Sequence, residues 1–177
     1  YWGEEGYTPA ERAGARPTLD INGMWGGFTG EGAKTVTPNE AHLKLTCRLV
    51  ANQDPDTIRD LIIDHIGKHV PPGIEWEFAS RTSFSRPYLI PRDNWALQTA
   101  AATMADVFGV PPIFYRVGGS VPITSTFKDS LDVESVGLGF SNPASPIHAP
   151  NEFYDLADIP VSQKGYAAAL IAFGEVE

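Results

Sequence analysis

The segment AHLKLTCRLV, residues 41–50, alternates apolar and polar side chains strictly as far as residue 49. Its apolar set is Ala41, Leu43, Leu45, Cys47 and Leu49, and its polar set is His42, Lys44, Thr46 and Arg48. A period of two residues is typical of a β-strand with one buried face. Asp54 and Pro55 then supply an N-cap and a first-turn proline. Apolar residues at helical spacing follow, so we expect a helix that ends before the PPG of 71–73.

Two further strands flank this strand and helix. Residues 16–23 form a short strand candidate that runs into a glycine-rich turn, and 74–78 alternate apolar with acidic side chains. The resulting order, β-β-α-β, is a ferredoxin-like β-α-β-β-α-β unit without its first strand and helix. The chain also begins YWGEEGY without a methionine. We therefore expect that it begins inside a longer protein, with a processed N-terminus as the alternative.

The second half of the chain alternates helices with short strands. Residues 83–94 contain two prolines and are typical of a linker. After them the pattern predicts helices at 95–108, 123–131 and 163–173, with strands at 113–115 and 135–140. We expect an α/β (α+β) protein with two domains, 1–82 and 83–177.

Composition and charge exclude several classes of function. The 177 residues are 42% apolar and 20% charged, with a net charge of -9. An acidic surface repels phosphate groups, so we expect no nucleic-acid partner and no membrane partner. Cys47 is the single cysteine, which excludes an internal disulfide and a cysteine-rich zinc site. We expect a cytoplasmic protein.

Two loops carry candidate chemistry. His148 follows a predicted buried strand, where a neutral imidazole can bind a divalent metal ion. The alternative is a surface histidine without a partner. Gly118 and Gly119 precede a predicted helix, and their backbone N–H groups could approach a carboxylate or an oxyanion closely. A tight strand-to-helix turn explains these glycines equally well.

Two other candidates lie on the first strand-helix unit. Arg48, on the polar face of its strand, can hold a carboxylate by two parallel hydrogen bonds, although a solvated strand charge is the simpler explanation. His65 and His69 have the spacing of a two-ligand metal clip. They lie in the last helical turn, where cationic side chains are common, and this explanation is favoured.

Taken together, several motifs resemble the C-terminal portion of the M20 family of zinc metallopeptidases, in the dipeptidase branch that includes carnosinase-like enzymes. The stretches that carry the resemblance are RPTLDING (16–23), GEGAKTVTP (30–38), LTCRLV (45–50), RVGGSVP (116–122) and HAPNE (148–152). Each motif is short, and their common order along the chain makes the set specific.

The resemblance implies a mixed-sheet catalytic domain that holds two zinc ions, with an inserted ferredoxin-like lid that also forms the dimer. Residues 1–82 would be the second half of this lid, and 83–177 the C-terminal part of the catalytic domain. The implied site residues are His148 as a ligand of one zinc, Arg48 at the carboxylate of a dipeptide, Thr35 near the substrate, and Gly118, Gly119 and Ser120 along the substrate pocket.

The sequence departs from the family pattern in one respect that matters for catalysis. The other zinc ligands and the catalytic glutamate belong to the family's N-terminal part, and this chain has no His-x-Asp motif. We therefore expect no catalytic residue in this chain and at most one zinc ligand. The expected protein is an inert part of a homodimeric zinc dipeptidase that needs the missing N-terminal part. The alternative is a non-catalytic dimerisation or binding module.

Overall fold

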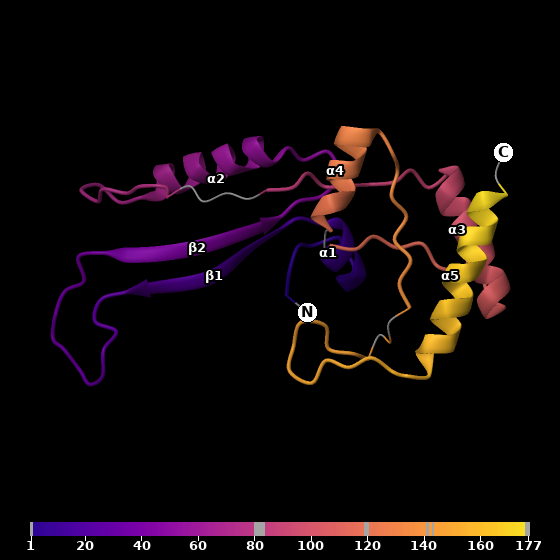
Figure 1. Cartoon of the computed structure of the whole chain (residues 1–177). Helices are drawn as coiled ribbons and strands as arrows, with labels where there is room; N and C mark the ends of the chain where they lie inside the picture. Colours follow the sequence, from indigo (N-terminus) through magenta and orange to yellow (C-terminus); the bar gives the residue numbers. More distant parts are fainter. Residues whose placement is uncertain (1, 80–83, 119–120, 141, 143, 176–177) are drawn as a thin grey trace. The chain divides into compact units, whose positions relative to one another are not determined.

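The computed structural model describes residues 2–79, 84–118, 121–140, 142 and 144–175. The elements, in order, are α1 (Pro9–Ala15), β1 (Thr18–Gly26), β2 (Ala41–Arg48), α2 (Pro55–His69), α3 (Trp95–Phe108), α4 (Pro122–Leu131) and α5 (Asp158–Gly174) (Figure 1). They form two compact units, one of Tyr1–Tyr88 with Tyr115–Ser125 and one of Leu89–Phe114 with Thr126–Glu177. The predicted domain boundary after residue 82 stays a prediction.

Helix α1 begins with a capping box that the sequence analysis missed. The Glu11 N–H donates to the Thr8 hydroxyl (3.3 Å), and the Glu11 carboxylate accepts from the Thr8 backbone N–H (2.8 Å). Pro9 occupies the first turn, where its missing N–H costs nothing. The spacing of Thr8 and Glu11 with an intervening proline is a recognisable helix start, so this signal was present in the sequence.

Strands β1 and β2 confirm the strands predicted at 16–23 and 41–50, and they pair as an antiparallel hairpin. The register runs from Thr18 opposite Arg48 to Gly26 opposite Ala41, with an irregularity between Ile21 and Gly23. One face of the hairpin is apolar, and it contains Leu19, Ile21, Met24, Leu43, Leu45 and Cys47. The opposite face carries the polar residues of β2, so the alternation in the sequence correctly predicts the two faces.

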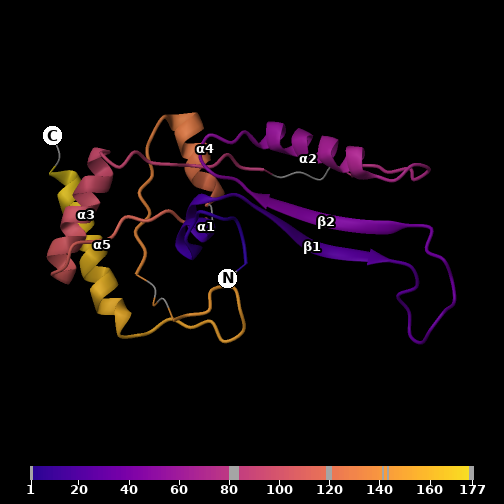
Figure 2. The same cartoon turned by 180° about the vertical axis from the view of Figure 1, so that it is seen from behind.

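Helix α2 confirms the predicted cap and both helix ends. The Asp54 carboxylate accepts from the Thr57 backbone N–H (2.9 Å) and hydroxyl (3.0 Å), and the helix ends at His69, before the prolines. Residues after α2 return beside the helix (Figures 1 and 2). There the Trp76 ring lies so close to Gly67 that a β-carbon at Gly67 would be 3.0 Å from it.

The prediction of a third strand at 74–78 is wrong. Ile74, Trp76 and Phe78 alternate as expected, but the segment has no strand structure, and among the described residues the sheet consists of β1 and β2. The predicted strands at 113–115 and 135–140 are also absent from these described segments. An alternating pattern becomes a strand only when a neighbouring backbone supplies its hydrogen bonds. The order in the first half is therefore α-β-β-α, within a mixed α/β fold.

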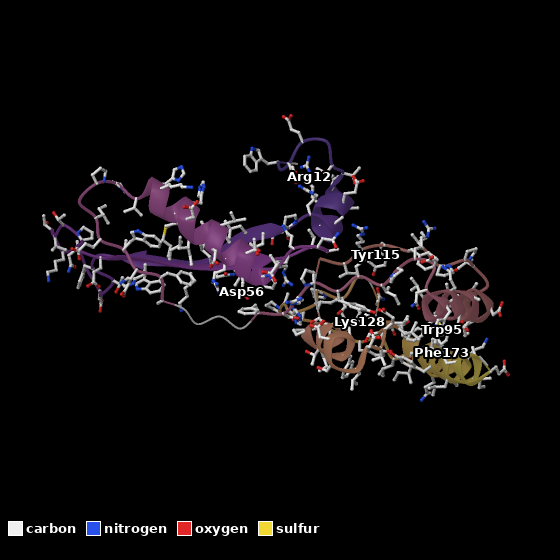
Figure 3. The ribbon with its side chains drawn as sticks, turned by 90° about the horizontal axis from the view of Figure 1, so that it is seen from above. Arg12, Asp56, Trp95, Tyr115, Lys128 and Phe173 are labelled. Atoms are coloured by element: carbon white, nitrogen blue, oxygen red, sulfur yellow. The ribbon has the colours of Figure 1, made fainter. Side chains whose placement is uncertain are left out.

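In the second unit, α3 and α5 pack against each other. Asn94 caps α3 through its side-chain oxygen, and Gly109 ends it in the left-handed conformation at φ 72°. Ala100 of α3 and Ala169 of α5 are each only 3% exposed. Trp95 and Phe173 meet edge to face at 6.2 Å (Figure 3). Small side chains along the contact let the two helices approach closely.

The same unit anchors the segment before the His148 loop through aromatic contacts. Phe140 stacks on Phe108 at 6.0 Å and meets Tyr166 edge to face at 4.8 Å. The Tyr166 hydroxyl donates to the Leu138 carbonyl (3.0 Å). A β-carbon at Gly165 would lie 2.4 Å from the Phe140 ring, so glycine makes room for it. These contacts fix residues 138–140 on α5 without any strand pairing.

Apolar burial is sparse in the part of the chain that the structure describes. There the buried apolar residues are Ala100 and Ala169, whereas large apolar side chains throughout both units are exposed. No described helix is long and apolar enough to cross a membrane.

Candidate substrate-binding and metal-binding residues

Arg48 is the last residue of β2 and lies opposite Thr18. Its side chain is exposed and forms no hydrogen bond or ion pair with the described residues. The strand fixes its backbone, while its guanidinium is free to bind an external group. A guanidinium in this state can take up a carboxylate by two parallel hydrogen bonds.

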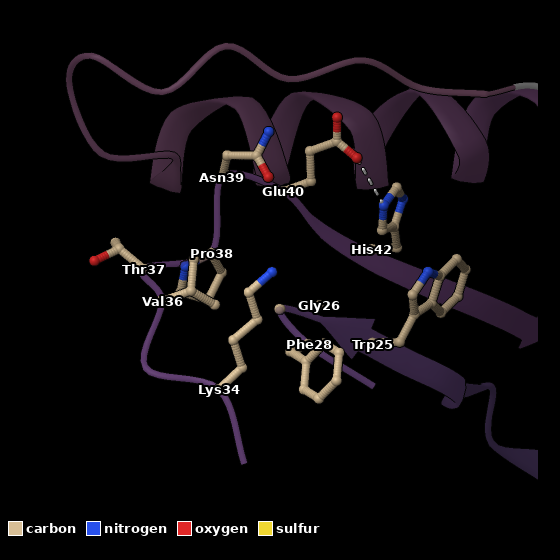
Figure 4. Close-up of a pocket in the computed structure, with 11 residues that line it drawn as sticks. Trp25, Gly26, Phe28, Lys34, Val36, Thr37, Pro38, Asn39, Glu40 and His42 are labelled. Carbon is tan, nitrogen blue, oxygen red and sulfur yellow. Dashed lines mark ion pairs between the residues drawn. The ribbon is translucent and has the colours of Figure 1, made fainter. Parts of the chain in front are cut away.

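Thr35 lies in the connection between β1 and β2, at the opposite end of β2 from Arg48. The connection and the strand ends line an open pocket of about 250 Å³ (Figure 4). Lys34 and Val36 line this pocket, whereas Thr35 is not among its lining residues. Seven strand steps from Ala41 to Arg48 span roughly 20 Å at about 3.3 Å per residue. The structure therefore does not bring Thr35 and Arg48 together.

Polar and aromatic side chains organise the pocket at this end of the hairpin. The ring of His42 stacks on Trp25 at 4.8 Å with an interplanar angle of 8°. Its Nε2 atom lies 3.5 Å from a carboxylate oxygen of Glu40, and the Lys34 ammonium lies 5.7 Å from the Phe28 ring centroid (Figure 4). These contacts brace the connection that carries Thr35.

Gly118 lies where two backbone segments come unusually close. A β-carbon at Gly118 would be 2.2 Å from the Ala13 carbonyl oxygen, and one at Gly14 would be 2.1 Å from the Arg116 carbonyl oxygen. The last turn of α1 thus packs directly on residues 116–118. Helix α4 begins at Pro122, one residue before the predicted start at 123. The predicted site residues Gly119 and Ser120 lie outside the described residues.

His148 is held at the turn of a loop that closes on itself. The Ser145 hydroxyl donates to the Phe153 carbonyl (2.7 Å) and accepts from the Phe153 N–H (3.2 Å), while the Glu152 carboxylate accepts from the His148 N–H (3.3 Å). His148 itself has a positive φ of 62°. Its imidazole is exposed and has no partner among the described residues. The loop therefore positions the His148 backbone and leaves its ring available.

The carboxylate next to His148 contacts its backbone and not its ring. The Glu152 carboxylate accepts a hydrogen bond from the backbone N–H of His148. A group that orients a metal-binding histidine would instead contact the ring nitrogen that does not bind the metal. Ser145, which is 8% exposed and ties the loop ends together, was missed. No sequence signal marks it, because a serine before a proline is ordinary in loops.

The described residues do not form a metal site on their own. They contain no group of three or more His, Cys, Asp or Glu side chains that could hold a metal ion. His148 can offer a single imidazole. Cys47 is half-buried, and this burial raises the pKa of its thiol, so it is not a reactive thiolate.

Comparison with known proteins shows which class of protein the chain resembles. Residues 3–74 match the peptidase dimerisation domain of M20 proteins. A Cys-Gly metallodipeptidase of Schizosaccharomyces pombe is 32% identical over 79% of this chain and 30% of its own length. The Saccharomyces cerevisiae enzyme of that name is 31% identical over 90% of this chain and 34% of its length. The mouse Beta-Ala-His dipeptidase is 29% identical over 77% of the chain and 28% of its length.

Solved structures show the same similarity. An M20 family metallo-carboxypeptidase from Sulfolobus solfataricus matches with a TM-score of 0.81 at 26% identity, over 99% of this chain and 40% of its own. The dipeptidase Dug1p of Saccharomyces cerevisiae matches with a TM-score of 0.70 at 26% identity, over 94% of this chain and 35% of its own. The fold is thus similar to that of metallopeptidases, and residues 3–74 match a peptidase dimerisation domain. The chain resembles the M20 metallopeptidases, and it spans about a third of the length of the curated relatives it matches.

Proposed function

We propose that this chain is the second half of the lid and the C-terminal part of the catalytic domain of a zinc-dependent dipeptidase. The observation that carries the proposal is the 31% identity over 90% of the chain to a Cys-Gly metallodipeptidase. That match includes both the hairpin with Arg48 and the loop with His148. The agreement extends to structure, since a metallo-carboxypeptidase of the family matches 99% of the chain.

Arg48 binds the carboxylate at the end of the dipeptide. Its guanidinium is exposed, unpaired among the described residues and set at a strand end, where the backbone holds it in place. Loss of a hydrogen bond to a charged group costs about 1.5–3 kcal/mol, which corresponds to roughly 10- to 100-fold in substrate affinity. The Gly118–Ser120 segment contacts another part of the substrate. Thr35 of the same chain lies at the opposite end of β2 and does not reach a dipeptide held by Arg48.

His148 contributes one imidazole to a zinc ion. Zinc, when bound, acts as a Lewis acid that activates water for attack on the peptide bond. The chain's own contribution is the closed loop from Ser145 to Phe153, which fixes the backbone from which the His148 ring projects. The remaining ligands and the general base come from polypeptide outside this chain. The isolated chain is therefore inactive.

The enzyme is a cytoplasmic homodimer. The support for a dimer is the match of residues 3–74 to a dimerisation domain. The acidic composition gives no reason to expect nucleic acid or a membrane as a partner.

The proposal is tested by hydrolysis of Cys-Gly and β-Ala-His dipeptides with zinc or manganese. The isolated chain should give no turnover, and turnover by it would overturn the inactivity. In the enzyme that contains this chain, Arg48→Gln should raise KM about 10- to 100-fold, while Lys44→Gln on the same strand face should leave KM unchanged. Equal KM values for the two variants would overturn the role of Arg48.

The same assay separates the alternative of a non-catalytic dimerisation or binding module. Such a module would bind dipeptides without hydrolysing them, or would only dimerise. This would hold even for the full-length protein that contains the chain. Dipeptide binding without turnover in that longer protein would favour the module over the dipeptidase.

A further inference from the structure

The last two turns of α2 carry a pair of histidines whose rings lie against each other. His65 and His69 are four residues apart, so they share one side of the helix. Their ring centroids are 4.2 Å apart with an interplanar angle of 31°. Both side chains are exposed, so the His65 ring can rotate without disturbing a packed neighbour. The pair therefore places two imidazole rings side by side in solvent.

One hydrogen bond fixes the protonation pattern of His69. Its Nδ1 atom lies 2.7 Å from the backbone carbonyl oxygen of His65. A carbonyl only accepts, so Nδ1 carries the proton and, in the neutral ring, Nε2 keeps its lone pair. A backbone carbonyl on the second ring nitrogen is the usual orienting partner of a metal-binding histidine. His69 thus has the arrangement of a metal ligand before any metal binds.

The electrostatic surroundings favour a bound cation. Lys68, the nearest ammonium in sequence, is paired with Asp64, and Arg59 is paired with Asp56 and Asp60. The pair also lies at the C-terminal end of α2, where the helix dipole is negative. The whole chain adds a net charge of -9. The positive charges of the helix are thus neutralised by carboxylates, and no free cation on α2 opposes binding.

We propose that His65 and His69 form a two-histidine clip for a borderline divalent transition-metal ion of the Zn²⁺, Ni²⁺ and Cu²⁺ group. Imidazole nitrogens suit these ions, and affinity rises from Ni²⁺ to Cu²⁺. Water molecules fill the remaining coordination positions of the ion, because the described residues contain no group of three or more His, Cys, Asp or Glu side chains that could hold a metal ion. The clip lies on α2 and uses neither His148 nor Arg48, so it is independent of the proposed peptidase chemistry.

The chain contains four histidines, so their NMR signals report the site directly. Titration of the whole chain with NiCl₂ or ZnCl₂ should perturb the ring signals of His65 and His69 together, with one ion bound per clip, and EDTA should reverse the change. MgCl₂, which prefers oxygen ligands, should leave both signals unchanged. Perturbation of neither ring by Ni²⁺ or Zn²⁺ would overturn the proposal.

Single variants distinguish a clip from two separate histidines. His65→Gln and His69→Gln should each weaken binding of the ion to the remaining ring by roughly 100-fold, because the second ligand of a linked pair acts at high effective concentration. His42→Gln, at an exposed histidine on the hairpin, is the matched control and should leave the affinity unchanged. A change of only about twofold in both α2 variants would show independent weak binding and overturn the clip. Circular dichroism of each variant confirms that α2 is intact.

Discussion

At the scale of single residues, the contact between α1 and residues 116–118 depends on two glycines. Gly14 and Gly118 each face a backbone carbonyl at a distance that a β-carbon cannot occupy. Gly118→Ala would place its β-carbon 2.2 Å from the Ala13 oxygen, so the two segments must separate. We expect a loss of about 1–3 kcal/mol in the free energy of unfolding, the usual cost of overpacking. Urea unfolding followed by tryptophan fluorescence measures it.

Gly137 provides the control for this effect. A β-carbon there meets nothing within 4 Å, and its backbone does not have the positive φ that favours glycine. Gly137→Ala should therefore leave the unfolding midpoint unchanged or slightly raised. Equal midpoints for Gly118→Ala and Gly137→Ala would mean that the α1 contact does not contribute to stability.

The N-cap of α2 should make stability depend on pH. The Thr57 backbone N–H and hydroxyl hold the pKa of Asp54 below its ordinary value of 3.8, with a further contribution from Arg86. A carboxyl whose folded-state pKa is lowered stabilises the fold fully above the unfolded-state pKa and loses that contribution as pH falls through the folded-state pKa. Below about pH 4, the wild type should lose helical circular dichroism that Asp54→Asn, an equally good uncharged cap, retains. If helical circular dichroism falls at the same pH in the wild type and in Asp54→Asn, Asp54 does not have this role.

Some candidate site residues can be recognised in the sequence, and others cannot. Arg48 and His148 stand out because a guanidinium and an imidazole carry recognisable chemistry in any context. The structure adds that both are exposed and unpaired among the described residues. Ser145 could not be found, because its importance comes from two hydrogen bonds to Phe153, eight residues away. Only folded geometry shows which of many serines closes a loop.

At the scale of elements, the α3–α5 contact relies on small side chains. Ala169 is 3% exposed on the face of α5 toward α3, whereas Ala167 on the same helix is exposed. Ala169→Leu should destabilise the protein by about 1–3 kcal/mol because the added atoms have no space. Ala167→Leu adds the same atoms toward solvent and should be nearly neutral. Thermal unfolding of the two variants tests this; equal melting temperatures would contradict close packing at Ala169.

Helices were predicted better than strands, for a physical reason. The backbone hydrogen bonds of helix α2 form within one segment of the chain, and its cap at Asp54 and its end before the prolines can be recognised locally. Even α5, predicted from 163, begins only five residues earlier, since a proline in the first turn is tolerated. The segment 74–78 has an equally clear pattern, but a strand depends on a neighbour that its own sequence does not specify.

At the scale of the whole molecule, the hairpin exposes apolar surface that favours self-association. Ile21 and Met24 are 66% and 78% exposed on the same face, and a two-stranded sheet leaves both edges unpaired. The segment that matches a dimerisation domain, residues 3–74, contains this hairpin. We expect the sedimentation coefficient of the chain to rise with concentration. Removal of this apolar face from water is the driving force for association.

A charge on the apolar face should weaken that association. Ile21→Lys should shift the midpoint of association to at least tenfold higher concentration, because a buried lysine without a partner is costly. Lys44→Gln, on the opposite face of the same hairpin, is the matched control and should leave the midpoint unchanged. Sedimentation velocity over a hundredfold concentration range measures both. A protein that stays monomeric throughout, or one in which both variants behave like the wild type, would rule out this face as the contact.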